Sequence, residues 1–161
     1  MLLIGLGNLL MSDEGIGVRL VAELEARKTV PPGVELLDMG TAGISILHQL
    51  AGHTKAVFVD CAFMGEEPGT LRRFTPEEVV THKVQTRLSL HEGDLLNTLK
   101  LAKELGDCPE EIIIFGIEPQ SVEPGLELTD ALENRVEYYL QQLVEEVSLT
   151  PCMNSRSANE S

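Results

Sequence analysis

The chain has 161 residues, which suits one domain at roughly 150 residues per domain. Its 12 Lys and Arg against 26 Asp and Glu give a formal net charge of −14, which disfavours nucleic acid and anionic membranes as partners. The amino terminus lacks the basic start of a secretory signal, and no apolar run reaches the roughly 18 residues of a membrane span. We therefore expect a soluble protein located in the cytoplasm.

Short apolar runs, bounded by glycine or acidic residues, predict buried strands. In chain order they cover residues 2–6, 34–37, 55–59 and 112–115. Residues 70–74 follow the third run after a turn that is too short for a helical crossover, so this segment is expected to join the sheet as an antiparallel strand.

Between the strands, apolar residues recur with the spacing of amphipathic helices. The predicted helical stripes cover residues 16–24, 44–50, 95–102 and 128–147, with Ser12 as the expected N-cap of the first. Alternating strands and helices indicate an α/β fold with a mainly parallel sheet covered on both faces. Residues 1–148 are expected to form a single domain, and residues 149–161, which lack periodicity, a disordered tail.

Acidic residues follow three of the predicted strands, at Glu14, Asp38 and Asp60, and His91 precedes the third helical stripe. The carboxyl ends of parallel strands meet at one edge of a sheet, where ligands bind. Two carboxylates about 5 Å apart repel by roughly 3 kcal/mol at an effective dielectric constant near 20, so such a cluster shares a proton or attracts a cation. Together, Glu14, Asp60 and His91 offer donors suited to nickel, zinc, iron or manganese.

Each of these residues also has a purely structural interpretation. Asp13 and Glu14 lie where a helix dipole favours acids. Asp38 and Asp60 could each accept a hydrogen bond from the turn that follows. Cys61, Cys108 and Cys152 contain no Cys-x-x-Cys pair, which disfavours a disulfide framework or a structural zinc site.

The glycines after the first strand begin like a dinucleotide fingerprint, but Leu10 stands where its third glycine would be, and Asp13 and Glu14 would repel a pyrophosphate. Gly15 and Gly17 are predicted to allow close packing of the helix on the sheet or the approach of a peptide backbone. With the glycine-rich turn at residues 40–43, they are expected to floor a shallow groove.

Five motifs, in this order and spacing, resemble those of the hydrogenase maturation endopeptidases. They are Gly-Leu-Gly-Asn-Leu-Leu-Met-Ser-Asp-Glu-Gly-Ile-Gly at 5–17, Asp-Met-Gly-Thr-Ala-Gly at 38–43, Phe-Val-Asp-Cys-Ala at 58–62, Ser-Leu-His at 89–91 and Gly-Ile-Glu-Pro at 116–119. The resemblance covers about residues 1–147. It implies a three-layer αβα sandwich with about five strands, one of them antiparallel.

The resemblance also implies an aspartic-type endopeptidase that removes the C-terminal extension of a nickel-iron hydrogenase large-subunit precursor after nickel insertion. The nickel carried by the substrate is then part of what is recognised, and other divalent metals are expected to bind in vitro. By this match Glu14, Asp60 and His91 contact the metal, and Glu14, Asp38 and Asp60 are the candidate catalytic acids. Many relatives carry two aspartates where this chain has Asp13 and Glu14, and glycine at Met39.

Three alternatives bear on this assignment. Peptidyl-tRNA hydrolases also begin with a strand and Gly-Leu-Gly-Asn, but the charge of −14 disfavours an RNA substrate. Cys61 has no evident base partner, which disfavours an acyl-enzyme mechanism. A non-enzymatic nickel carrier or scaffold for hydrogenase assembly would use the same Glu14, Asp60 and His91, and only cleavage of the precursor separates it from a protease.

Overall fold

The computed structural model describes residues 1–41, 45–81, 87–88 and 92–149. Its centre is a mixed sheet with the strand order β2-β1-β3-β6-β4, and β5 pairs with β3 outside this path. The strands are β1 (Leu2–Leu6), β2 (Glu35–Gly40), β3 (Lys55–Phe63), β4 (Leu71–Phe74), β5 (Arg87–Leu88) and β6 (Glu111–Ile117). β1 runs parallel to β2 and β3, and β3 runs parallel to β6. The segment expected to be antiparallel is β4, which pairs antiparallel with β6, so the predicted α/β fold class is confirmed.

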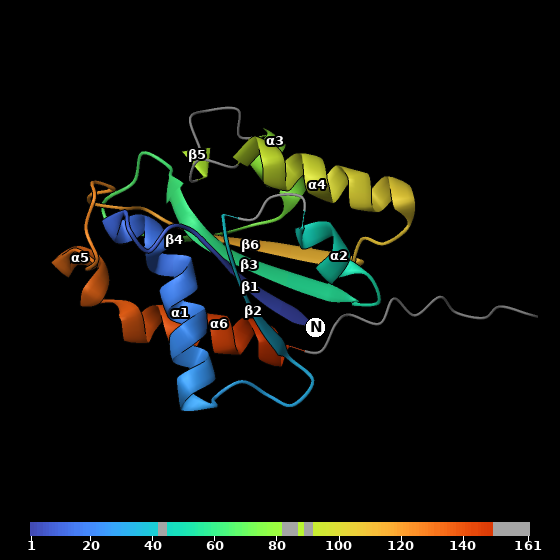
Figure 1. The fold of residues 1–161 in the computed structure, drawn as a ribbon, viewed down its shortest axis with the longest axis horizontal. Coiled ribbons are helices and arrows are strands. Elements are labelled where there is room, and N and C mark those ends of the chain that lie inside the picture. Colours follow the sequence, from blue (N-terminus) through green and yellow to red (C-terminus); the bar gives the residue numbers. More distant parts are fainter. Residues whose placement is uncertain (42–44, 82–86, 89–91, 150–161) are drawn as a thin grey trace, which may run out of the picture.

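Helices cover both faces of this sheet (Figure 1). They are the 3-10 helix η1 (Ser12–Gly15) and the α-helices α1 (Ile16–Arg27), α2 (Ile46–Leu50), α3 (Pro76–Thr81), α4 (Glu92–Leu105), α5 (Asp130–Glu133) and α6 (Val136–Ser148). In Figure 1, α1 and α6 lie against one face, and α2 and α4 lie against the other. The arrangement is the three-layer sandwich that the resemblance implied.

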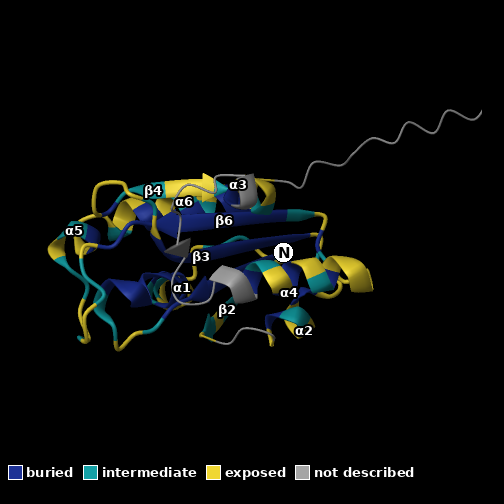
Figure 2. Cartoon of the chain, turned by 90° about the horizontal axis from the view of Figure 1, so that it is seen from above, coloured by how far each residue is buried: buried dark blue, intermediate teal, exposed yellow. Residues whose placement is uncertain are grey.

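Two hydrophobic cores, one on each face, hold the layers together. On the α1 and α6 side, Val59 packs with residues of both helices. On the α2 and α4 side, the neighbouring Phe58 packs with Leu50 and Leu99. Successive side chains of a strand point to opposite faces, so the central strand β3 is buried on both sides and reads as a continuous apolar run. Figure 2 shows that β3 and β6 are largely buried, and that the exposed residues of the helices lie on their outer surface.

Several local predictions were wrong. Ser12 is not the N-cap of α1, because it begins η1 with a φ of 51° and its hydroxyl donates to the Glu123 carbonyl. The single helical stripe at 128–147 forms α5 and α6, separated at Asn134 and Arg135, where the Arg135 side chain donates to the Gly69 carbonyl. The short elements α3 and β5 had no predicted counterpart.

Two further predictions concern the chain as a whole. Residues 150–161 of the expected tail lie outside the described residues, and Leu149 is exposed at the end of α6. Within the part of the chain that the structure describes, no helix has the length and apolar character needed to cross a membrane.

A buried ion network lies at the amino edge of the sheet, where β3 begins. The ammonium group of Lys55, whose side chain is 1% exposed, lies 2.8 Å from Glu146 Oε1 and 3.4 Å from Glu111 Oε1. The guanidinium of Arg73 bonds both oxygens of the same Glu146 carboxylate. Burial raises the pKa of the Glu146 carboxyl, but the hydrogen bonds from Arg73 and Lys55 outweigh burial, and the net shift is downward from 4.5.

We expect Glu146→Gln to lower the free energy of unfolding at pH 7 by about 3 kcal/mol, because it leaves Lys55 buried without its nearest countercharge. The pKa of Glu146 is lowered on folding, so its contribution is complete above the unfolded value of 4.5 and disappears as the pH falls through the folded value. Urea unfolding of wild type and variant at pH 7, 5 and 4 measures this difference. Glu145→Gln, at an exposed neighbouring position, is the matched control and should change stability by less than about 0.5 kcal/mol. An equal effect of the two substitutions would contradict the prediction.

Candidate active site

Three loops meet at the carboxyl edge of the sheet, the end opposite the Lys55 network (Figure 1). The first leads from β1 into η1, the second joins β3 to β4, and the third runs from β6 to α5. Ligands bind at this edge in open parallel sheets. Two of the predicted site residues, Glu14 and Asp60, lie here and are each only 4% exposed.

Glu14 is held by close packing of η1 against the end of β1. Its amide donates to the Met11 carbonyl. A Cβ atom at Gly7, which has a φ of 134°, would lie 1.9 Å from the Glu14 carbonyl oxygen, so no larger residue fits there. The strand-to-helix turn therefore brings the Glu14 backbone directly onto the sheet end.

The glycines of the first motif serve this packing. A Cβ atom at Gly17 would lie 2.2 Å from the Val59 carbonyl oxygen and 2.4 Å from that of Leu6, which confirms close approach of α1 to the sheet. Gly15 and Gly17 are both buried, and the shallow groove that they were expected to floor together with residues 40–43 stays a prediction. Gly43, from the second glycine-rich turn, lies outside the described residues.

Asp60 lies near the carboxyl end of β3, in register with Gly116 of β6. Its Oδ1 accepts a hydrogen bond of 2.8 Å from the amide of Cys61, which lies in the same strand and not in a following turn. By strand alternation Asp60 belongs to the face on which Phe58 and Ala62 pack, which is the face covered by α2 and α4.

The electrostatics of the site are visible at Cys61, whose side chain is fully buried. Burial raises the pKa of the Cys61 thiol far above its usual range, and the charges of four carboxylates raise it further. In order of effect, these belong to Asp60, Glu14, Asp13 and Glu118. The structure therefore gathers negative charge around this thiol, an environment that disfavours a thiolate nucleophile.

The remaining predicted site residues are placed differently. Asp38 is exposed on β2, and its Oδ1 accepts a 3.0 Å hydrogen bond from the Gly40 amide, as the turn interpretation expects. It pairs in register with Gly5 of β1, so one strand separates it from Asp60. His91 lies outside the described residues. Among the residues that are described, no three His, Cys, Asp or Glu side chains form a group that could hold a metal ion.

Asp13 has a role that the sequence analysis missed. Its fully buried carboxylate accepts four hydrogen bonds from the loop after β6. The donors are the amides of Gln120 at 2.9 Å, Ser121 at 3.1 Å and Thr129 at 2.8 Å, and the Thr129 hydroxyl at 2.7 Å. Asp13 thereby ties η1, which carries Glu14, to the opposite side of the site. In the sequence, its only signal is an acid next to a candidate acid.

Glu118 was also missed, although it follows a predicted strand as Asp38 and Asp60 do. It is 7% exposed, and its Oε2 accepts a 2.6 Å hydrogen bond from the Met64 amide. Its backbone bonds Gly69 and Thr70, so it holds both ends of the loop between β3 and β4. The same search for acids after strands would have found it.

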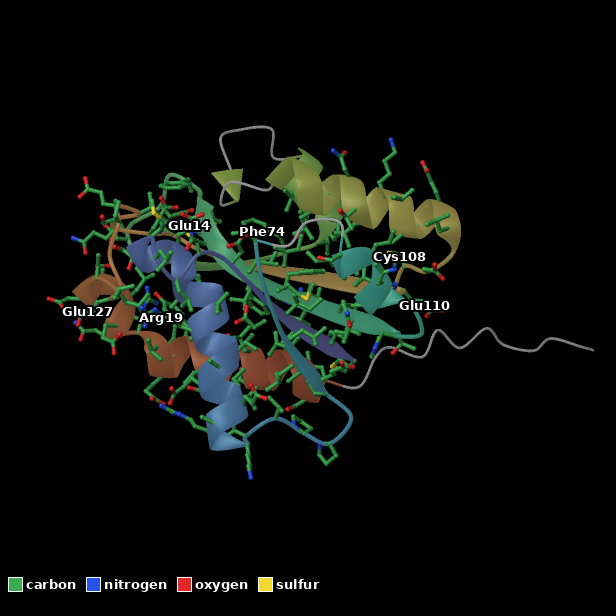
Figure 3. The ribbon with its side chains drawn as sticks, viewed as in Figure 1. Glu14, Arg19, Phe74, Cys108, Glu110 and Glu127 are labelled. Carbon is green, nitrogen blue, oxygen red and sulfur yellow. The ribbon has the colours of Figure 1, made fainter. Side chains whose placement is uncertain are left out.

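A cavity of about 1120 Å³ lies away from these acids, between α4 and the amino end of β6. Leu96, Lys100, Cys108 and Glu110 are among its lining residues. Figure 3 shows Cys108 and Glu110 at the opposite end of the molecule from Glu14. The carboxylate cluster, rather than this cavity, therefore defines the candidate active site.

Comparisons with a family model, with related sequences and with solved structures all identify the same protein family. A family model described as hydrogenase maturation protease matches residues 18–146, a range that includes Asp38, Asp60 and His91 but starts after Glu14. The chain belongs to the hydrogenase maturation protease family. It is 35% identical over 144 residues to the hydrogenase 2 maturation protease of Escherichia coli, covering 89% of this chain and 87% of that protein.

Solved structures of family members share the fold. The hydrogenase maturating endopeptidase HybD from E. coli superposes with a TM-score of 0.81 at 32% identity, covering 91% of each chain. A hydrogenase 2 maturation peptidase from a Thaumarchaeota archaeon gives a TM-score of 0.68 at 31% identity, covering 92% of this chain and 98% of that one. As a member of this protease family, the chain has an endopeptidase role in hydrogenase maturation.

We expect Asp13→Ala to lower the free energy of unfolding of this maturation protease by about 3 kcal/mol, because buried donors then lose their charged acceptor. Thr129→Val, which removes only the hydroxyl contact, should cost about 1 kcal/mol. Urea unfolding measures both, with Asp130→Asn at an exposed position nearby as the control. A cost for Asp13→Ala no larger than that of the control would show that the four hydrogen bonds do not hold the loops together.

Proposed function

We propose that this protease removes the C-terminal extension from a nickel-iron hydrogenase large-subunit precursor once nickel has been inserted. The observation that carries the proposal is the pair of buried carboxylates, Glu14 and Asp60, held at the carboxyl edge of a hydrogenase maturation protease fold. Nickel is here part of the substrate.

The donor chemistry of the site supports recognition of that nickel. Glu14 and Asp60 are hard oxygen donors in an environment already crowded with negative charge, which favours a divalent cation. His91 would add an imidazole nitrogen, since it immediately precedes α4, which packs on the face to which Asp60 belongs. Oxygen and imidazole ligands together suit nickel and zinc better than copper(I).

Burial and nearby carboxylates raise the pKa of the Cys61 thiol, which supports hydrolysis by activated water rather than through an acyl-enzyme. In the proposed step, the carboxylate of Glu14 or Asp60 accepts a proton from water. The water oxygen bonds to the scissile carbonyl carbon, the carbon–nitrogen bond breaks, and the proton passes to the departing amine. This assignment of a carboxylate as the base agrees with an aspartic-type protease.

Asp38 has a different part in the proposal. Its carboxylate is exposed at the same edge of the sheet, where a docked polypeptide can reach it. It is separated from Asp60 by β1, so we assign it to contact with the precursor rather than to the hydrolytic step.

The test is cleavage of purified large-subunit precursor, nickel-loaded and nickel-free, followed by mass spectrometry. We expect the protease to shorten only the nickel-loaded form. Glu14→Gln, Asp60→Asn and His91→Gln should each lower the rate at least about 100-fold, the contribution typical of a positioned acid or base. Glu110→Gln, an exposed acid at the opposite end of the molecule, is the control and should leave the rate unchanged.

Two results would contradict the proposal in different ways. Equal cleavage of both precursor forms would remove nickel as a recognition element. Binding of the nickel-loaded precursor without any change in its mass would favour the alternative of a carrier or scaffold.

A further inference from the structure

Large apolar side chains are exposed beside the candidate active site. Leu9, Leu10 and Leu126 are 42%, 63% and 67% exposed, and we call them the leucine patch. Leu9 and Leu10 belong to the loop between β1 and η1, and Leu126 belongs to the loop between β6 and α5. Large exposed apolar side chains that come from neighbouring loops, and are not scattered singly, indicate a site of interaction with another molecule.

The two loops that carry the patch are joined to each other. The Gly125 amide donates to the Leu10 carbonyl, and the Ser12 amide donates to the Gly125 carbonyl, both at 2.9 Å. Met11 and Gly125 form a short parallel bridge between the two loops. Leu10 directly precedes Met11, and Leu126 directly follows Gly125, so both leucines lie next to this bridge.

Further contacts fix the backbone on both sides of this bridge. The side chain of Asn8 accepts a 3.0 Å hydrogen bond from the Leu10 amide, and Arg19 donates to the Leu126 carbonyl. The Asp13 carboxylate holds the rest of the loop between β6 and α5 by accepting hydrogen bonds from the amides of Gln120 and Thr129. The leucines are thus presented on an ordered backbone, and little conformational entropy is lost when a partner covers them.

The position of the patch ties it to the site. Leu10 precedes Glu14 by four residues, and the intervening Met11 carbonyl accepts the Glu14 amide hydrogen bond. Figure 3 shows Glu14, Arg19 and Glu127 at one end of the molecule, away from Cys108 and Glu110. A polypeptide seated at Glu14 and Asp60 can therefore extend across the patch.

Charge indicates what kind of segment fits. Glu123 and Glu127 flank Leu126 and are exposed, and the chain as a whole carries −14. Acidic surface around an apolar centre is complementary to a segment whose apolar side chains are accompanied by Lys or Arg. A partner with an acidic segment would be repelled from the same place.

We propose that the leucine patch is a docking surface for an apolar, basic segment of the polypeptide that this protease cleaves, outside the residues around the scissile bond. The proposal rests on the proposed function, because it takes the hydrogenase precursor as the occupant. It assigns substrate affinity to Leu10 and Leu126, and leaves hydrolysis to the carboxylates.

The test compares Leu10→Ser/Leu126→Ser with Leu105→Ser, which changes a 58% exposed leucine at the far end of α4. With nickel-loaded precursor, we expect the double variant to raise KM at least tenfold, a change equivalent to about 1.4 kcal/mol. Its kcat should stay within twofold of wild type, and Leu105→Ser should change neither constant. A structural role would instead lower the thermal midpoint, which circular dichroism measures for all three proteins.

A second pair of variants tests the charge argument. Glu123→Gln/Glu127→Gln should raise KM at low ionic strength and have little effect at high salt, where charges at the rim of an interface are screened. An unchanged KM in the leucine double variant, with wild-type cleavage intact, would overturn the docking surface and leave the proposed function standing.

Titration calorimetry separates the remaining outcomes. If wild type binds the precursor without cleaving it, the proposed function fails, and weaker binding by the leucine double variant than by Leu105→Ser still supports the docking surface. If wild type neither binds nor cleaves the precursor, both proposals fail.

Discussion

The carboxylate of Asp13 is the contact on which the geometry of the site depends. One buried group receives the amides of three residues and a hydroxyl from a loop that lies more than a hundred positions away in the chain. It fixes η1 against that loop, so Glu14 and the leucine patch are held by the same anchor. Without it, Gly7 and Gly17 would still let α1 approach the sheet, but the first and third loops would lose four of the hydrogen bonds that join them.

The layered fold was predictable from the spacing of apolar residues, because each strand and each helix buries an apolar face. The apolar run of β3 shows burial on both sides, and the short turn before β4 excludes a parallel connection. What the pattern could not show was set by distant contacts. Arginine is a residue type that favours helices, so the sequence predicts that the last helix continues through Arg135. In the structure the Arg135 side chain donates to the Gly69 carbonyl, and the predicted helix is divided there. Serine is a common N-cap residue, but the backbone amide of Ser12 donates to the Gly125 carbonyl beside the bridge between the two loops.

The site was predictable to the extent that topology decides it. Acids after parallel strands lie at one edge of the sheet, which is where Glu14 and Asp60 are buried, and the same rule would have found Glu118. The same rule predicts that Asp38 belongs to the site. In the structure its side chain accepts a hydrogen bond from the Gly40 amide at the exposed margin of the sheet. Asp13 was beyond this reasoning, because Gln120 and Ser121, which supply two of its hydrogen-bond donors, lie in a segment with no strand or helix pattern to locate it.

The position of Cys61 separates it from the acid beside it in the sequence. Its side chain packs in the buried core on the α1 and α6 side, and burial together with nearby carboxylates raises the pKa of its thiol. Successive side chains of a strand point to opposite faces, so the backbone of β3 lies between this sulfur and the face to which Asp60 belongs.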